Sequence, residues 1–174
     1  MGTFAEGQIR RDELSRVTSP AFSDIRVLNC SDIDGIQDIA CTSFDTLWSR
    51  QDYGYFLSHP CRFACGIFRP RNENGGRSDN GEFRLVSYLI GLVVSQELDV
   101  ITVATHPDFR RQGLSELLFE HTIRDPNISK LFLEVGTDNL SAQMLYRKIG
   151  FTATGTRLAY YASKKDAYTM SYFK

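Results

Sequence analysis

Residues 100–118 constrain the fold more than any other stretch of the chain. The stretch begins with an apolar, β-branched run that is typical of a strand, and Pro107 ends this run because proline has no N–H for the strand ladder. A basic pair follows at residues 110–111. Beyond it, leucines recur at the i, i+3, i+4 spacing of a helix that begins near Gly113 and ends before Asp125.

This predicted helix start has the features of an anion-binding site. The first turn of a helix leaves about four N–H groups unpaired and carries roughly half a positive charge. Gly113 allows a ligand to approach the backbone, Ser115 adds little bulk, and Arg110 and Arg111 add positive charge, which together favour a diphosphate. A surface loop that merely leads into a core helix could contain the same residues. The rest of the sequence is needed to distinguish this interpretation from an anion-binding site.

Length and composition set the class of protein. The chain has 174 residues and 42% apolar content, which suits one compact domain with a core that needs no metal ion or disulfide. Its formal net charge is −1, so no overall basic field exists to hold nucleic acid. No N-terminal apolar run is long enough for a signal peptide or a membrane span. We therefore expect a cytoplasmic, globular protein that binds neither nucleic acid nor membrane.

The four cysteines do not favour a metal site. All lie in the first 65 residues, at spacings that match neither a zinc-ligand pattern nor a disulfide framework. His59, Cys61 and Cys65 could supply three ligands, but a fourth is missing. We therefore expect reduced thiols and no bound metal ion.

The first third of the chain is expected to hold one strand and one helix. Residues 1–23 are polar without a sustained period, so we expect a loose N-terminal extension ahead of a single domain over residues 24–174. Residues 25–28 alternate like a strand, and residues 31–40 have the apolar spacing of a helix. Residues 45–57 are interpreted as a loop-like aromatic stretch, suited either to the core or to one wall of a binding cleft.

Two further pairs of strands are expected. Residues 62–68 and 85–94 form the first pair, joined by a long hairpin loop at 69–81 that is rich in Gly and Asn. Residues 151–161 and 167–173 form the second pair and close the chain. The sequence contains no internal repeat and no second domain.

The centre of the chain predicts a βαβ unit. Residues 130–135 are a compact apolar run, typical of a strand buried on both faces, and this strand should lie parallel to the strand before Pro107. Ligands of open α/β sheets collect at the carboxyl ends of such strands, near Glu134. A second helix follows, capped at residues 138–139 and ended by Gly150.

Together these motifs resemble the GCN5-related N-acetyltransferase (GNAT) family over residues 24–174. The acetyl-CoA signature of that family is Arg or Gln, two residues, Gly, any residue, then Gly or Ala. Arg110 and Gly113 fit this signature, and Ser115 replaces the usual small apolar residue. The resemblance implies an α/β (α+β) fold: a central mixed, mostly antiparallel, twisted sheet of about six or seven strands, with flanking helices and one parallel βαβ unit that binds acetyl-CoA.

Within this family the chain most resembles the bacterial ribosomal-protein alanine N-acetyltransferases, which acetylate the N-terminal alanine of a small-subunit ribosomal protein. The residues that carry this resemblance are Trp48-Ser49, His106-Pro107-Asp108-Phe109, Leu133-Glu134-Val135, Asn139, Leu145-Tyr146, Gly150-Phe151, Tyr160-Tyr161, Asp166-Ala167 and Met170. The implied reaction transfers an acetyl group from acetyl-CoA, as co-substrate, to a protein N-terminus, through a ternary complex and without a covalent enzyme intermediate.

The resemblance also implies roles for individual residues. Glu134 is the implied general base, Tyr146 the general acid, and Asn139 a contact to coenzyme A. The other implied cofactor-binding residues are Val103, Ala104, Thr105, Arg110, Arg111, Gln112, Gly113, Leu114, Ser115 and Glu116. The implied acceptor-binding residues are Trp48, Ser49, Tyr160 and Tyr161. Glu116 departs from the family, in which a basic residue is common here, and it would repel a diphosphate if it pointed inward.

Simpler roles remain open for the same residues. Burial between Leu133 and Val135 should raise the pKa of Glu134, as a general base requires, yet a glutamate at a strand end can equally face solvent or pair with an arginine. Tyr146 lies on the apolar face of its helix, where a core tyrosine is ordinary. Asn139 could serve only as a helix cap, and the aromatic acceptor-binding residues could simply fill the core.

Three functions therefore stay under consideration. The first is acetyl transfer to a protein N-terminus, with a ribosomal protein as partner. The second is acetyl transfer to a small amine such as an antibiotic or a polyamine. The third is a regulatory module that binds coenzyme A without turnover, which the departures at Ser115 and Glu116 would permit. In each case we expect a monomer or a weak dimer.

Overall fold

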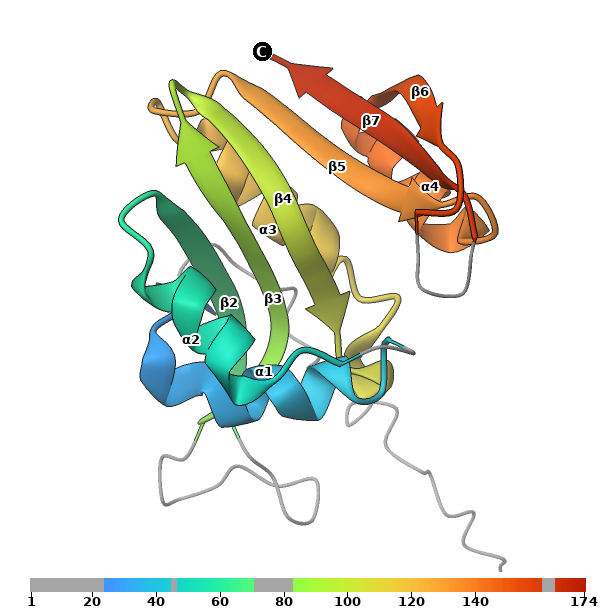
Figure 1. Ribbon diagram of the computed structural model, residues 1–174. Helices are drawn as coiled ribbons and strands as arrows, with labels where there is room; N and C mark the ends of the chain where they lie inside the picture. Colours follow the sequence, from blue (N-terminus) through green and yellow to red (C-terminus); the bar gives the residue numbers. More distant parts are fainter. Residues whose placement is uncertain (1–23, 45–46, 71–82, 161–164) are drawn as a thin grey trace, which may run out of the picture.

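The computed structural model describes residues 24–44, 47–70, 83–160 and 165–174, which form one seven-stranded sheet with the order β1-β2-β3-β4-β5-β7-β6 (Figure 1). Every neighbouring pair is antiparallel except β4 and β5. The strands are β1 (Ile25–Val27), β2 (Arg62–Pro70), β3 (Phe83–Val94), β4 (Glu97–Thr105), β5 (Lys130–Gly136), β6 (Thr152–Arg157) and β7 (Ala167–Phe173). This mixed, mostly antiparallel sheet confirms the expected fold class.

Helices cover both faces of the sheet. In the described part of the chain these are α1 (Ile33–Ala40), α2 (Arg50–Ser58), α3 (Leu114–Arg124) and α4 (Leu140–Ile149), with short 3₁₀ turns η3 (Cys30–Asp32) and η4 (Pro107–Phe109) before α1 and α3. On β3, Tyr88 and Ile90 pack in the cluster with α1 and α2, whereas Val86 and Leu89 pack in the cluster with α3 and α4. The two pairs of helices therefore lie on opposite faces.

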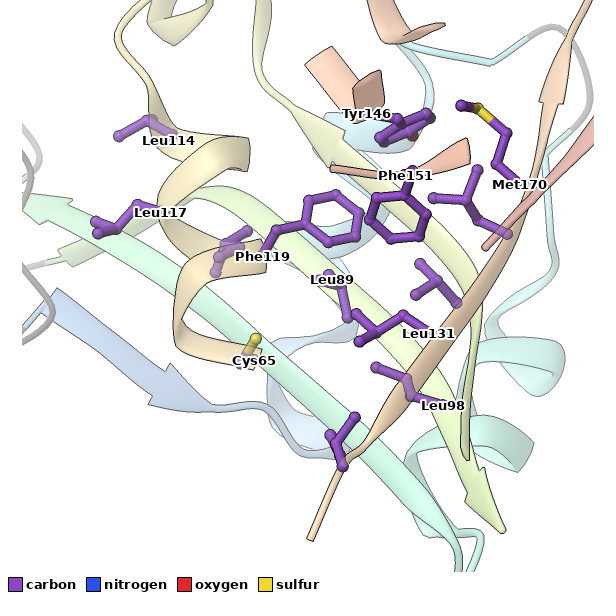
Figure 2. Close-up of a cluster of buried hydrophobic side chains, with 14 of the residues drawn as sticks. Cys65, Leu89, Leu98, Leu114, Leu117, Phe119, Leu131, Tyr146, Phe151 and Met170 are labelled. Atoms are coloured by element: carbon purple, nitrogen blue, oxygen red, sulfur yellow. The ribbon is translucent and has the colours of Figure 1, made fainter. Parts of the chain in front are cut away.

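The core beneath α3 and α4 is built around three aromatic rings (Figure 2). The centroid of Phe119 lies 5.5 Å from those of Tyr146 and Phe151, in edge-to-face geometry. Gly150 adopts a left-handed conformation (φ 112°) that ends α4, and the N–H of Phe151 then donates to the carbonyl oxygen of Tyr146 (2.9 Å). This turn brings the ring of Phe151 into the core.

Strands β4 and β5 separate toward their carboxyl ends (Figure 1). They pair only from Glu97 to Val100 on β4, although β4 continues to Thr105 and β5 to Gly136. Ile90 pairs with Thr102 and Gly91 with Val100, so Ile101 is an extra residue that forms a β-bulge in β4. A bulge bends and twists its strand, which accounts for the separation.

The prediction for one segment is wrong. Residues 50–57, expected to be loop-like, belong to the helix α2. Ser49 caps this helix: its Oγ accepts from the N–H of Asp52 (3.2 Å), and its own N–H donates to the Asp52 carboxylate (2.8 Å). The many aromatic residues and Gly54 obscure the helical pattern, because neither residue type is a strong helix former.

Two details of the expected strands also need correction. Strand β5 is buried on one face, not two: Leu131, Leu133 and Val135 are buried, whereas Glu134 between them is partly exposed. The strand expected at 151–161 covers only Thr152–Arg157. The expected extension at 1–23, residues 71–81 of the expected hairpin loop, and Tyr161 lie outside the described residues.

We expect the bulge to depend on Gly91. A Cβ at this position would overlap the carbonyl oxygen of Asp99 and lie 2.7 Å from Cδ1 of Leu98. Gly91→Ala should therefore lower the free energy of unfolding by about 1–3 kcal/mol, measured by urea denaturation. Gly54→Ala is the matched control, because no heavy atom lies within 4 Å of its Cβ position, and it should raise stability by about 0.5–1 kcal/mol. Equal effects of the two changes would contradict this account.

Candidate active site

The separation of β4 from β5 leaves a backbone edge without a strand partner. From Thr102 to Thr105, no described strand pairs with the side of β4 that faces β5. The side chain of Val103 packs against the α3 and α4 cluster, and Ala104 is buried in the α1 and α2 cluster. With these side chains engaged on the two faces, the backbone of this edge can hydrogen-bond an extended ligand that carries amide groups.

The start of α3 follows directly after this edge. Arg111 (φ 60°) and Gly113 (φ 76°) both adopt left-handed conformations, which bend the chain into the helix. No described residue accepts a hydrogen bond from the N–H groups of Leu114, Ser115 or Glu116. Open space surrounds the Cβ position of Gly113. The residues therefore fit the diphosphate that the sequence predicts: unpaired donors, a positive helix end and room for an anion.

A chain of hydroxyl groups joins this helix start to β4. The Oγ of Ser115 lies 2.9 Å from Oγ1 of Thr105, which lies 2.7 Å from Oγ of the fully buried Ser87. Ser87 donates in turn to the carbonyl oxygen of Ala104 (3.1 Å), so the other two hydroxyls must donate along the chain toward it. The residue that departs from the family signature at position 115 thus fixes α3 to the end of β4.

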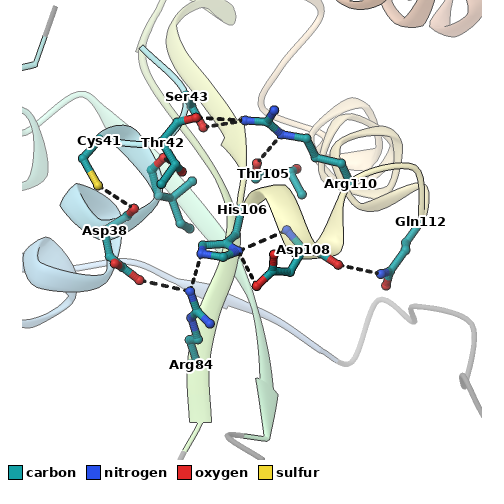
Figure 3. Close-up of polar contacts among 11 residues, drawn as sticks. Asp38, Cys41, Thr42, Ser43, Arg84, Thr105, His106, Asp108, Arg110 and Gln112 are labelled. Carbon is teal, nitrogen blue, oxygen red and sulfur yellow. Dashed lines mark hydrogen bonds and ion pairs between the residues drawn. The ribbon is translucent and has the colours of Figure 1, made fainter. Parts of the chain in front are cut away.

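The two arginines of the loop differ in their contacts (Figure 3). Arg110 donates from Nε to the carbonyl oxygen of Thr105 (3.1 Å), and from Nη2 to the carbonyl oxygen of Thr42 (3.3 Å) and the Oγ of Ser43 (3.2 Å). It therefore joins the loop to the segment after α1. Arg111 is exposed and makes no ion pair with a described residue, so its charge remains available to a ligand.

Sequence reasoning missed a polar network beside this loop (Figure 3). Arg84 of β3 contacts Nε2 of His106, and it also forms an ion pair with Asp38 of α1 (3.2 Å). Nδ1 of His106 accepts from the N–H of Asp108 (3.3 Å). Further along, Nε2 of Gln112 donates to the carbonyl oxygen of Asp108 (3.4 Å). Single-sequence patterns contain no signal for this network, because its members come from three distant segments.

Glu116 is directed away from the helix start. Its carboxylate forms an ion pair with Nζ of Lys148 on α4 (2.7 Å). The negative charge is therefore balanced within the protein rather than directed at a bound anion. The departure of residue 116 from the family pattern is thus compensated by the neighbouring helix.

Glu134 lies near the end of β5, on the sheet face opposite α3 and α4. Its neighbours Leu133 and Val135 pack into the α3 and α4 cluster, which turns its own side chain, 20% exposed, to the other face. Oε1 lies 3.1 Å from Nε of Arg157 on β6. Burial raises the pKa of Glu134, Arg157 lowers it, and the charge of Asp99 raises it, with a net rise. Both expected features, a raised pKa and an arginine partner, occur together.

Tyr146 and Asn139 have structural surroundings that match their simpler roles. Tyr146 is buried on the opposite side of the sheet from Glu134, packed against Phe119 and Phe151. The side chains of Tyr146 and Glu134 therefore lie on opposite faces of the sheet. Oδ1 of Asn139 accepts from the N–H of Ala142 (3.2 Å), which confirms it as the cap of α4.

The structure describes three of the acceptor-binding candidates, which lie on two different segments, one at the start of α2 and one after β6. Trp48 stacks on Phe56 of α2, with centroids 4.9 Å apart, and packs against the α1 and α2 cluster. Ser49 is occupied as the α2 cap. Tyr160 is 45% exposed, and the guanidinium carbon of Arg157 lies 5.7 Å from its ring centroid. Of these three described residues, Tyr160 is the one linked to Arg157 and Glu134.

Sequence reasoning also missed Asp99 and Arg157, which act on Glu134 from β4 and β6. The alternation of apolar and charged residues around Asp99 could have predicted that this residue lies on the solvent-facing side of a strand. Within the described ranges, no three His, Cys, Asp or Glu side chains are grouped in a way that could hold a metal ion. Across those same ranges, the helices are too short or too polar for any of them to span a membrane.

The model of the acetyltransferase (GNAT) family matches residues 33–151. The [ribosomal protein bS18]-alanine N-acetyltransferase of Escherichia coli (strain K12) is 33% identical over 94 residues, which cover 51% of this chain and 64% of that enzyme. The N-alpha-acetyltransferase RimI of Mycobacterium tuberculosis (strain ATCC 25618 / H37Rv) is 33% identical over 116 residues, which cover 64% of this chain and 72% of that protein.

Solved structures agree with these matches. The crystal structure of the Escherichia coli ribosomal-protein-S18-alanine N-acetyltransferase aligns with a TM-score of 0.70 at 26% identity, covering 84% of this chain and 90% of that one. Arabidopsis thaliana NAA60, crystallised in complex with acetyl-CoA, shares the fold with a TM-score of 0.73 at 15% identity, covering 86% and 97% of the two chains. The chain therefore belongs to the GNAT acetyltransferase family and is an acetyl-CoA-dependent N-acetyltransferase.

Proposed function

We propose that this enzyme acetylates the α-amine of a protein N-terminus, and that its acceptor is the N-terminal alanine of a small-subunit ribosomal protein of the bS18 type. The names of the Escherichia coli and Mycobacterium tuberculosis relatives support an N-terminal acceptor. Because ribosomal proteins are made and assembled in the cytoplasm, this proposal also gives the cytoplasm as the site of action. The proposed complex needs no metal ion, since acyl transfer from a thioester requires only a base and a proton donor.

The observation that carries the proposal is the surroundings of Glu134. A partly buried carboxylate with a raised pKa lies beside the unpaired edge of β4, at the carboxyl end of the parallel strand pair. An amine attacks a thioester only when it is neutral, and a base with a raised pKa can remove its proton near neutral pH. Glu134 is therefore the proposed general base, acting directly or through a water molecule.

Energetics favour an α-amine over a lysine side chain. An α-amine with a pKa near 8 needs about 1.4 kcal/mol for deprotonation at pH 7, against about 4.6 kcal/mol for a lysine near 10.4. A carboxylate whose pKa is raised only by partial burial is suited to the smaller of these demands. Deprotonation of an N-terminal acceptor by Glu134 therefore costs less free energy than deprotonation of a lysine side chain.

The remaining candidate residues divide the other tasks. The backbone of Val103, Ala104 and Thr105 is proposed to hold the pantetheine arm of acetyl-CoA, which supplies the acetyl thioester. The N–H groups that begin α3, with the charge of Arg111, are proposed to hold its diphosphate. Tyr146 is the proposed hydrogen-bond donor to the departing thiolate. Because the ordinary pKa of a tyrosine, about 10, lies above that of a thiol, about 8.5, we propose that it acts mainly through this hydrogen bond and not by full proton transfer. Asn139 is proposed to touch coenzyme A as well as to cap α4.

The peptide prediction compares acceptors by the release of free thiol from acetyl-CoA. A peptide that carries the N-terminus of bS18 and begins with alanine should react fastest, because its amine is the easiest to deprotonate. The same peptide with a blocked α-amine and an added lysine is the matched control, and it should react far more slowly. If the enzyme acetylates spermidine or an aminoglycoside but none of the peptides, the proposal is wrong and the enzyme is a small-amine acetyltransferase.

A second prediction concerns the role of Glu134. Glu134→Gln should lower kcat/KM for the alanine peptide by about 10²–10⁴-fold, with the greatest loss at pH 6–7, where the amine is mostly protonated. Glu120→Gln on the exposed side of α3 is the control and should leave the pH–rate profile unchanged. If the Glu134→Gln profile runs parallel to that of the unaltered enzyme, Glu134 is not the base.

A further inference from the structure

Four side chains form an electrostatic cluster on the sheet face opposite α3 and α4. Asp99 comes from β4, Glu134 from β5, Arg157 from β6, and Tyr160 follows β6. Leu98 and Val100, the neighbours of Asp99, pack into the α3 and α4 cluster, so Asp99 points to the same face as Glu134. Arg157 reaches across β7 to place its Nε 3.1 Å from Oε1 of Glu134 and lies over the ring of Tyr160.

The four described side chains of this cluster carry one more negative than positive charge when both carboxylates are ionised. Asp99 and Glu134 carry two negative charges when ionised, and among the residues that the structure describes Arg157 is the positive charge that acts on both. Burial raises the pKa of Asp99 while Arg157 lowers it, and burial likewise raises that of Glu134 while Arg157 lowers it and Asp99 raises it. A second cation, or a cation in place of Arg157, would be attracted to this face.

The other described groups near Glu134 do not supply that cation. From β7, the residue opposite Glu134 is the neutral Thr169. On β5 itself, Lys130 is at the far end of the strand and is paired with Glu97 (2.6 Å). Tyr160 is neutral at physiological pH, because burial and the charge of Glu134 raise its pKa.

The two partners of the ion pair differ in their freedom to move. The side chain of Arg157 is 59% exposed, whereas that of Glu134 is 20% exposed and its backbone pairs with Thr169 of β7. Because more than half of the Arg157 side chain is exposed, it can turn into solvent at small cost. Glu134 stays where β5 holds it.

From this geometry we propose that Arg157 is a positioning residue that occupies the place of the acceptor's ammonium group in the resting enzyme. When the acceptor enters, Arg157 turns away and the ammonium binds between Asp99 and Glu134. One N–H bond of the ammonium then breaks and one O–H bond forms on Glu134, which leaves a neutral amine. The inference rests on the proposed function, because it takes Glu134 as the group that receives the proton.

Two substitutions should then have opposite effects. Arg157→Ala removes the internal competitor and should lower the KM of the alanine peptide about two- to fivefold, whereas Asp99→Asn removes half of the ammonium site and should raise it by a similar factor. Protonation of Glu134 should set the apparent pKa of the acid limb of the kcat/KM profile. This apparent pKa should rise by about one unit in Arg157→Ala and fall by about one unit in Asp99→Asn.

The experiment measures kcat/KM and KM for the alanine peptide from pH 5 to 9 in both variants. Arg157→Lys, which keeps the charge, should behave like the unaltered enzyme, and Arg124→Ala, an equally exposed charge removal on α3, should change neither quantity. A KM that rises or stays constant in Arg157→Ala, or shifts of the acid limb in the same direction in both variants, overturns the proposal.

A titration that does not depend on turnover separates this inference from the proposed function. The carboxyl carbon of Glu134, followed by NMR in the free enzyme, should titrate at higher pH in Arg157→Ala and at lower pH in Asp99→Asn. If no amine in the acceptor panel is acetylated, the proposed function fails, yet these opposite shifts would still establish the cluster. Unchanged titration in both variants overturns the cluster even if the enzyme is active.

Discussion

The separation of β4 from β5 is the constraint on which the rest of the site depends. Two parallel strands that stayed paired to their ends would satisfy each other's backbone groups and leave no edge for a ligand. The pairing ends after Val100, next to the bulge at Ile101, and Gly91 leaves room there for the carbonyl oxygen of Asp99. The end of the pairing gives β4 a free backbone edge beside Glu134, so that this separation provides both a binding surface and access to a carboxylate.

Around this opening, several residues that resemble ligand contacts have structural partners in the protein. Arg110 joins the loop to the segment after α1, Ser115 bonds to Thr105, and Glu116 pairs with Lys148. Ser115 thereby holds the start of α3 against the end of β4 and Glu116 holds it against α4, while the N–H groups of residues 114–116 have no described partner. In the proposed site, binding therefore comes mainly from the backbone, and polar side chains fix the position of that backbone. Such a division suits a ligand with a diphosphate and amide groups.

The sequence predicted those parts of the fold that local patterns determine. The strands, three of the helices and the turn at Gly150 follow from apolar spacing, proline and glycine. Helix α2 was missed because its cap, Ser49 with Asp52, precedes a segment of weak helix formers. The sequence predicted that Glu134 could pair with an arginine but did not identify Arg157. That pairing depends on the strand order, in which β7 lies between β5 and β6. The proposed role of Glu134 was inferred from the family resemblance, and the residues around it are seen only in the structure.

The most direct measurement of the central claim is amide hydrogen exchange of the whole protein with and without acetyl-CoA. If the opening between β4 and β5 binds this co-substrate, exchange should slow at the unpaired edge of β4, residues 102–105, and at the start of α3, residues 112–116. Exchange that is unchanged in both segments at saturating acetyl-CoA, or slowed only elsewhere in the chain, would contradict the account.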